Sequence, residues 1–324
     1  MWALIAGLLF SAGPATAYET DDVTMKRRQQ GILTGMPFMA NVAPRTFVDD
    51  LGRKIYLAQA PKRLVSLAPS ITETLYAIGL ADRVVGVTEF CDYPPEARNK
   101  PKVGYSNPNL ETIVALQPDL VLAPRDFIRP DVLGKLEQLK IPTFVVEAKT
   151  VEDIASQIQL IGRMLDRSEV ANPIAMELRR QLTELKRRTE MLARPRVLYV
   201  LNSQPLITVG PGSFIHQLIE IAGGANVAAG AASPYPRLSI EAVLKEDPQL
   251  IIFPVGASEG IPQGEQELWR RWKTMTAVKT DSFHRIASDL LNRPGPRIVL
   301  GLEKLAEIIH PEVFTPSNAK PVRP

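Results

Sequence analysis

Two short segments of the sequence repeat one another and carry an acidic side chain at the same place. Residues 109–123 (NLETIVALQPDLVLA) align without a gap with residues 239–253 (SIEAVLKEDPQLIIF), so that Glu111 corresponds to Glu241. Each copy predicts a capped helix of two turns, a proline break and a buried strand. Any such unit needs a similar apolar pattern, and the first turn of a helix favours acids. The residues alone therefore leave open whether the glutamates bind a partner or only begin a helix.

A tyrosine precedes each of these glutamates by six residues. Tyr105 and Tyr235 both lie in loops rich in proline, glycine and serine. Ligands of open α/β sheets bind in the crevice at the strand ends, so the pair predicts two rings that close on a flat ligand from two sides. The alternative is that each tyrosine packs into the loop of its own lobe.

Other reactive side chains have simpler structural explanations. Ser213 and His216 could support nucleophilic catalysis by a hydrolase, but they lack a nucleophile elbow, and the serine more simply caps a helix. The three histidines have no ligand-like spacing and Cys91 is the only cysteine, so we expect no metal site. Ser70 and Glu73 fit the spacing of a capping box. We therefore expect no catalytic residues.

The first residues predict export. Residues 1–12 are small and apolar, and the following Ala15-Thr16-Ala17 fits a signal peptide cleaved near Ala17. The apolar run is far below the ~20 residues that a membrane span needs. Because the one cysteine is distant from that site, we expect an unlipidated, periplasmic protein. The 38 basic and 35 acidic residues are spread along the chain, so nucleic acid is not an expected partner.

Apolar strands alternate with helices over most of the 324 residues, a length that fits about two domains. Strands that are apolar on both faces and separated by helices predict a parallel sheet covered on both sides. After a hairpin at 45–60, strands are predicted at 64–68, 84–88, 120–123, 144–148, 196–202, 206–209, 250–253 and 284–287. Helices are predicted at 72–80, 111–117, 131–140, 213–222, 240–246, 265–276 and 296–309.

One long amphipathic helix separates the two alternating halves. Apolar residues recur every three or four positions through residues 168–193, and Pro195 ends the pattern. The fold class is therefore α/β, with two Rossmann-like lobes of parallel sheet and a long α-helix between them. The predicted organisation is a signal peptide (1–17), a flexible arm (18–44), an N-terminal lobe (45–167), a linking helix (168–194), a C-terminal lobe (195–310) and a tail (311–324).

Five segments resemble the helical-backbone class of periplasmic solute-binding proteins, which serve ABC importers of cobalamin, haem and iron chelates. The resemblance covers about residues 45–312. Its segments are 63–80 (RLVSLAPSITETLYAIGL), 85–97 (VGVTEFCDYPPEA), 109–123, 208–228 (TVGPGSFIHQLIEIAGGANVA) and 289–306 (DLLNRPGPRIVLGLEKLA). The run Cys91-Asp-Tyr-Pro-Pro95 is most similar to the cobalamin-binding branch.

This resemblance implies two lobes joined by one long rigid helix, with little lobe closure. It implies that Glu111 and Glu241 dock with arginines of a membrane permease. It places the aromatic residues of the cleft at Phe90, Tyr105 and Tyr235. A further acid of the cleft, Asp289, is implied to accept a hydrogen bond from the ligand.

The same resemblance leaves the ligand open, because tyrosines and Pro124 stand where cobalamin binders have tryptophans. Tyrosine can also ligate ferric haem, and Arg125 or Arg237 could meet propionates or the carboxylates of a chelate. We therefore expect a monomer that captures a corrinoid (cobalamin) and delivers it to an ABC permease of the inner membrane. The alternatives are a haem or ferric-siderophore binding protein and, from another class, a periplasmic serine hydrolase.

Overall fold

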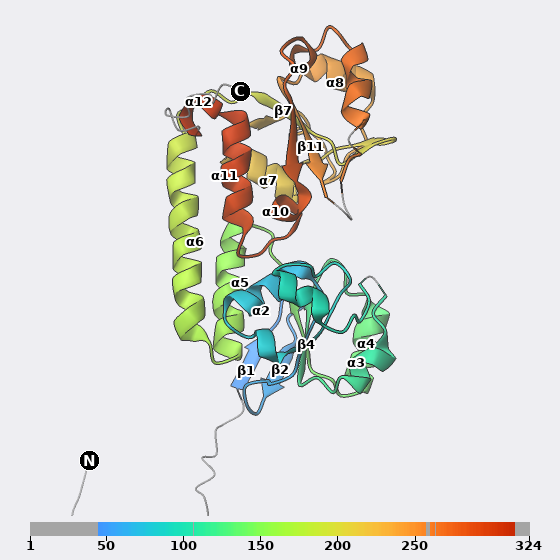
Figure 1. Ribbon diagram of the computed structural model, residues 1–324, viewed down its shortest axis with the longest axis vertical. Coiled ribbons are helices and arrows are strands. Elements are labelled where there is room, and N and C mark those ends of the chain that lie inside the picture. The colour runs from blue at the N-terminus through green and yellow to red at the C-terminus, as the bar shows by residue number, and fades with distance from the viewer. Residues whose placement is uncertain (1–44, 106, 257–259, 263, 315–324) are drawn as a thin grey trace, which may run out of the picture. The chain divides into compact units, whose positions relative to one another are not determined.

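The computed structural model of the chain describes residues 45–105, 107–256, 260–262 and 264–314 (Figure 1). The predicted signal peptide (1–17) and arm (18–44) lie outside these residues, as does the tail after residue 314. Among the described residues, no helix is both long and apolar enough to cross a membrane.

The N-terminal lobe is built on four parallel strands in the order β4-β3-β5-β6. Successive residues of β3 point to opposite faces: Leu64 joins a core with α2 and α5, and Val65 joins a core with α3 and α4. Its elements are β1 (Arg45–Val48), β2 (Lys54–Leu57), β3 (Leu64–Ser66), α2 (Pro69–Ala77), η1 (Ala81–Arg83), β4 (Val84–Val87), η2 (Pro95–Asn99), α3 (Leu110–Ala115), β5 (Leu120–Pro124), α4 (Pro130–Gln138), β6 (Thr143–Val146) and α5 (Val151–Met164).

The C-terminal lobe has the equivalent parallel sheet, in the order β10-β7-β11-β12. Its elements are β7 (Arg196–Tyr199), β8 (Asn202–Ser203), β9 (Leu206–Ile207), α7 (Phe214–Ile221), β10 (Ala225–Asn226), α8 (Ile240–Glu246), β11 (Leu250–Val255), η3 (Glu265–Arg271), α9 (Thr276–Lys279), β12 (Phe283–Ala287), α10 (Ser288–Asn292), α11 (Ile298–Ile309) and α12 (Pro311–Phe314). The two parallel sheets confirm the predicted fold class.

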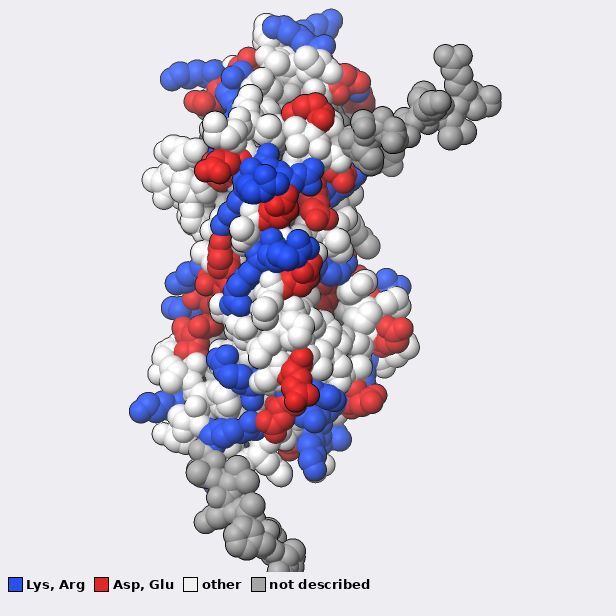
Figure 2. All heavy atoms as spheres, turned by 90° about the vertical axis from the view of Figure 1, so that its left-hand side faces the viewer, with Lys and Arg blue, Asp and Glu red and all other residues white. Residues whose placement is uncertain are grey.

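The long helix is α6 (Ser168–Thr189), of 22 residues, which ends earlier than the predicted linking segment 168–194. It lies beside α5 of the first lobe and α11 of the second (Figure 1). Its outer surface carries interspersed charges of both signs (Figure 2), including the pair between Arg180 and Glu177 at 2.7 Å. The inner surface joins one apolar cluster that contains residues of both lobes, from Leu57 to Ile309.

The duplicated segments have the same local structure in both lobes. Asn109 and Ser239 cap α3 and α8. The side chain of Asn109 accepts a hydrogen bond from the backbone N–H of Thr112 at 3.0 Å, and that of Ser239 accepts one from the N–H of Ala242 at 3.2 Å. Both predicted N-caps are therefore confirmed. Each helix is followed by a non-glycine residue in the left-handed region, Gln117 and Asp247, both with φ of 46°.

An arginine holds this turn in each lobe. Nε of Arg63 donates to the carbonyl oxygens of Leu116 and Gln117 at 3.0 and 3.1 Å. Nε of Arg196 donates to the equivalent carbonyls of Glu246 and Asp247 at 2.9 and 2.8 Å. The repeat seen in the sequence thus extends to a pair of arginines outside the aligned segments.

The prediction of one helix was wrong, one predicted strand is shorter than expected, and one helix was not predicted. The predicted helix 265–276 is the 3₁₀ helix η3 followed by α9, because Asp247 accepts a hydrogen bond from the backbone N–H of Thr276 at 2.7 Å and starts a new helix there. The predicted strand 206–209 is present but shorter, as β9 (Leu206–Ile207), which pairs antiparallel with β8 in a small hairpin. Helix α5 was not predicted, although Thr150 and Asp153 form a capping box at its start.

Candidate functional site: a cleft between the lobes

A cavity of about 560 Å³ is lined by residues of both lobes. Its size lies within the range of about 300–1,000 Å³ that is usual for small-molecule sites. The N-terminal lobe contributes the loops after β3, β4 and β5, and the C-terminal lobe contributes α7, α10 and the loop before α8. The cavity therefore lies where the strand ends of two open α/β sheets meet, the usual place for a ligand in such folds.

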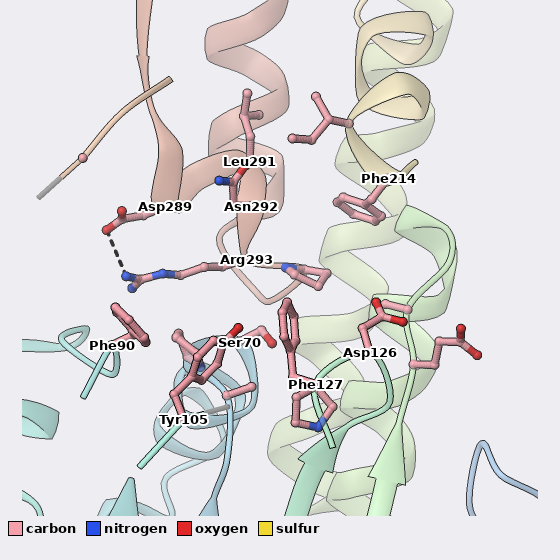
Figure 3. A pocket seen from close by; sticks show the side chains of 18 of the residues that line it. Ser70, Phe90, Tyr105, Asp126, Phe127, Phe214, Asp289, Leu291, Asn292 and Arg293 are labelled. Atoms are coloured by element: carbon pink, nitrogen blue, oxygen red, sulfur yellow. Dashed lines mark ion pairs between the residues drawn. The ribbon is translucent and has the colours of Figure 1, made fainter. Parts of the chain in front are cut away.

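Three aromatic rings form a cluster on the N-terminal side of the cavity (Figure 3). Phe90 and Tyr105 meet edge to face, with ring centroids 4.9 Å apart, and Tyr105 lies 5.1 Å from Phe127. Tyr105 follows Gly104, whose φ of 86° suits glycine and whose added Cβ would lie 2.8 Å from the carbonyl oxygen of Asn107. This tight turn fixes the backbone position from which the side chain of Tyr105 extends.

Tyr235 lines the cavity from the C-terminal lobe and is 59% exposed. Its loop is fastened to the glycine-rich turn before α7, since the N–H of Gly210 donates to the carbonyl of Pro234 at 2.8 Å. A Cβ on Gly210 would lie 2.6 Å from the carbonyl oxygen of Ser233, so only glycine permits this close approach. The turn at 210–213 thus positions Tyr235.

Arg293 lies at the boundary between the lobes in the cavity wall (Figure 3). It donates to Asp92 at 2.7 Å, and its guanidinium lies 3.3 Å from Glu73 and 3.5 Å from Asp289. Burial acts to raise the pKa of Asp92, but the hydrogen bond and charge of Arg293 outweigh it and lower that pKa. The predicted ligand acceptor Asp289 therefore lies in the cavity wall, beside an arginine that also contacts two other acids.

The capping box predicted for Ser70 and Glu73 is wrong. Helix α2 begins at Pro69 without a side-chain cap, and Glu73 instead accepts two hydrogen bonds from Arg297 of the other lobe, at 2.6 and 2.8 Å. Glu73 is 3% exposed, so the pair is desolvated and links the two lobes directly. Close backbone contact accompanies it, since a Cβ on Gly295 would lie 3.3 Å from the carbonyl oxygen of Ser70.

Of the two arginines considered as ligand contacts, only Arg125 lines the cavity among the described residues. It is paired with Glu147 at 2.9 Å and donates to the carbonyl of Asp50 at 2.8 Å. The next residue in the sequence, Asp126, also lines the cavity. Burial, and next the negative charge of Asp126, raise the pKa of Tyr235 in the opposite lobe.

The residues considered for a hydrolase have structural roles. Ser213 accepts a hydrogen bond from the N–H of His216 as the cap of α7 and donates to the carbonyl of Gly210 at 2.7 Å. The ring of His216 faces the side-chain amide of Asn226 at 2.8 Å. Over the described part of the chain, no group of histidine, cysteine and acidic side chains could hold a metal ion.

The two repeated glutamates lie outside the cavity. Glu111 and Glu241 are exposed in the first turns of α3 and α8, one on each lobe. Backbone and Ser239 hydrogen bonds lower the pKa of Glu241, which keeps this carboxylate charged at neutral pH. Neither glutamate lines the cavity, so any role of the pair lies on the outer surface.

Sequence reasoning missed Phe127, Asp126 and the link between Glu73 and Arg297. Phe127 lies three residues after Pro124 at the carboxyl end of β5, so its position beyond a strand end was an available signal. The link had no comparable signal, because its partners are 224 residues apart in the chain.

A model of the periplasmic binding protein family matches residues 64–290. The vitamin B12-binding protein of Vibrio cholerae is 34% identical over 246 residues, which cover 75% of this chain and 87% of that protein. The solved structure of the Vibrio cholerae vitamin B12-binding protein superposes with a TM-score of 0.69 at 32% identity, covering 77% of this chain and 96% of the other.

Two further solved structures share the fold. A haem-binding protein from Roseiflexus matches with a TM-score of 0.70 at 23% identity, covering 78% of this chain and 99% of that one. A structure titled as an Fe³⁺-hydroxamate transport system from Saccharomonospora viridis matches with a TM-score of 0.64 at 26% identity, covering 82% and 99%. With the family model matching well over half of its residues, this chain belongs to the periplasmic binding proteins.

Proposed function

We propose that this protein captures a corrinoid, cobalamin, in the cleft between its lobes and delivers it to an ABC import permease. Proteins of this family bind small solutes outside the cytoplasm for a transport permease and carry no catalytic activity. The choice of a corrinoid is supported by the 34% identity to a vitamin B12-binding protein, and by aromatic rings that line one cavity from both lobes.

In the proposed complex the planar macrocycle packs against the ring cluster that contains Phe90 and Tyr105, and Tyr235 covers its other side. Aromatic faces suit a large flat ligand because they supply apolar area without a rotamer-rich side chain to order. Asp289 accepts a hydrogen bond from an amide at the edge of the ligand. The link between Glu73 and Arg297 keeps the cleft at a nearly constant width, so little closure accompanies binding.

Haem and ferric siderophores are the alternatives within the same fold. Ferric haem could take a phenolate as its ligand, and burial together with the charge of Asp126 raises the pKa of Tyr235, which acts against the phenolate form. Propionates or chelate carboxylates would need free guanidinium groups, whereas Arg125 and Arg293 are each already paired with acids. The pairing of both arginines favours a ligand with uncharged edges, such as the carboxamides of a corrin.

Glu111 and Glu241 are proposed as the docking points for arginines of the permease, one on each lobe. Both carboxylates are exposed, occupy equivalent positions of the repeat and lie in the first turns of helices of similar length. Exposed charges of this kind contribute modestly to affinity but orient the encounter and speed it. We further propose an exported periplasmic monomer, with a signal peptide removed near Ala17.

Isothermal titration of the purified protein with cyanocobalamin tests the proposal. Wild-type protein is expected to bind one equivalent, and Tyr105→Ala to bind at least tenfold more weakly, because truncating a central aromatic contact costs about 2 kcal/mol. Trp269→Phe is the control, since Trp269 packs in the core of the C-terminal lobe away from the cavity. Absence of cobalamin binding by the wild type would reject the proposal.

A further inference from the structure

We infer that Asp126 sets the specificity of the cleft, selecting ligands with uncharged hydrogen-bond donors at their edge and rejecting ligands with carboxylates there. The inference rests on the proposed function, and it adds the chemistry that the edge of the ligand must have. It concerns discrimination between relatives of one macrocycle rather than the binding of the macrocycle itself.

The charge of the cavity is the first observation. Its lining includes four acids (Asp92, Asp126, Glu147 and Asp289) and two bases (Arg125 and Arg293). The acids therefore outnumber the bases before any ligand enters. A cavity with excess negative charge between two protein walls focuses a field that attracts donors and cations and repels anions.

The charge of each arginine is already offset by acids of the protein. Arg125 donates to Glu147 and to the carbonyl of Asp50. Arg293 contacts Asp92 at 2.7 Å and Asp289 at 3.5 Å, besides Glu73. A carboxylate of the ligand would have to share an arginine with an acid that already lies beside it.

Asp126 is the acid of the cavity lining whose charge is not balanced by a nearby arginine within the described part of the chain. Each of the other three lies within 3.5 Å of an arginine. Asp126 is exposed, and it makes no hydrogen bond or ion pair within the described part of the chain. It is held between Arg125 and Phe127 in the turn that follows β5.

Asp126 is placed to lie near the edge of a ligand that stacks in the cavity. It is adjacent in sequence to Phe127, which belongs to the N-terminal ring cluster, and its charge acts on Tyr235 from the opposite lobe. Figure 3 shows Asp126 beside Phe127 in the cavity lining. In the proposed complex, a ring held between Tyr105 and Tyr235 presents its rim to this carboxylate. Amide N–H groups on the rim can donate to it, whereas a carboxylate on the rim meets a like charge.

A matched pair of corrins tests the inference. Dicyanocobinamide carries amide side chains and dicyanocobyrinic acid carries carboxylates on the same macrocycle, so the ratio of their dissociation constants isolates the charge of the edge. Titrations would compare wild type with Asp126→Asn and Asp126→Lys. The control is Asp82→Asn, which changes an exposed aspartate that does not line the cavity.

Wild type is expected to prefer the amide corrin, and Asp126→Asn to lower that preference roughly tenfold, as expected for one like charge removed at close range. Asp126→Lys should lower it further, and added salt should reduce the wild-type preference. An Asp126→Asn ratio within twofold of wild type, with cobinamide still bound, would overturn the inference alone. Failure of the wild type to bind either corrin would overturn both the inference and the proposed function.

Discussion

At the scale of single residues, Glu73 shows how a sequence motif can fit the wrong structure. Its spacing from Ser70 satisfied a capping box, yet its carboxylate meets Arg297, which also lies over the ring of Tyr93 at 3.8 Å. The bidentate pair is desolvated and crosses the boundary between the lobes. A charge in such a place is costly when its partner is removed.

Replacing Glu73 with Gln should therefore destabilise the protein by about 3 kcal/mol, because it leaves two arginines near a largely buried neutral group. Urea unfolding would measure the change. Glu96→Gln is the control, since Glu96 is exposed and makes no ion pair within the described residues. A loss below about 1 kcal/mol, the usual value of a surface pair, would contradict the structural role given to Glu73.

Part of the candidate site could be predicted from the sequence, because the repeat marks it. Tyr105 and Tyr235 were recognisable because the repeat put them in register, and both line the same cavity. Phe127 and Asp126 have no counterpart that the repeat would reveal. Their importance follows only from the turn after β5, which brings them beside Tyr105.

At the scale of elements, the helix–turn–strand unit of the repeat carries the same strain twice. Gln117 and Asp247 both have φ of 46°, where a residue with a Cβ is unfavourable. Asp247 is compensated by hydrogen bonds from the backbone N–H and the hydroxyl of Thr276, each at 2.7 Å. No such side-chain bond is made by Gln117 to any described residue.

Glycine at these two positions should accordingly act in opposite directions. Gln117→Gly should stabilise the protein by about 0.5 kcal/mol, since relief of the left-handed conformation exceeds the entropy gained by the unfolded chain. Asp247→Gly should destabilise it by about 2 kcal/mol through the lost hydrogen bonds. Urea unfolding of both variants checks the signs, and equal effects at both sites would refute this account of the repeat.

Elements with a strong local pattern were predictable, and those set by tertiary contacts were not. Helix α8 has the predicted bounds, 240–246, because its cap, its apolar spacing and its proline are all local. The segment 265–276 is broken because a distant residue, Asp247, supplies a new helix start. The β8–β9 hairpin likewise depends on its pairing with the loop that carries Tyr235, through a bridge between Ile207 and Arg237.

At the scale of the whole molecule, the two lobes share one apolar cluster along α6, and the charged link at Arg293 and Arg297 joins them beside the cleft. Two attachments of this kind resist hinge motion. A permease would therefore recognise a nearly constant spacing between Glu111 and Glu241, and charge rather than closure would align the protein on it.

The double variant Glu111→Arg with Glu241→Arg should reduce uptake through the cognate permease by at least tenfold while ligand affinity stays unchanged. Like charges would then face the arginines of the permease. Uptake of labelled cobalamin and titration of the purified variant measure the two effects. The matched control is Glu169→Arg with Glu190→Arg, exposed residues at the start of α6 and directly after its end, which has the same charge change. Loss of ligand affinity in the first variant would contradict a docking role.

The central claim is that the cleft holds a corrinoid, and a competition measured by absorption tests it most directly. The purified protein would be incubated with equal amounts of cyanocobalamin and haemin, separated from free ligand and scanned. The account predicts corrin bands at one equivalent per chain and no Soret band. A Soret band without corrin bands would contradict it and identify haem as the ligand.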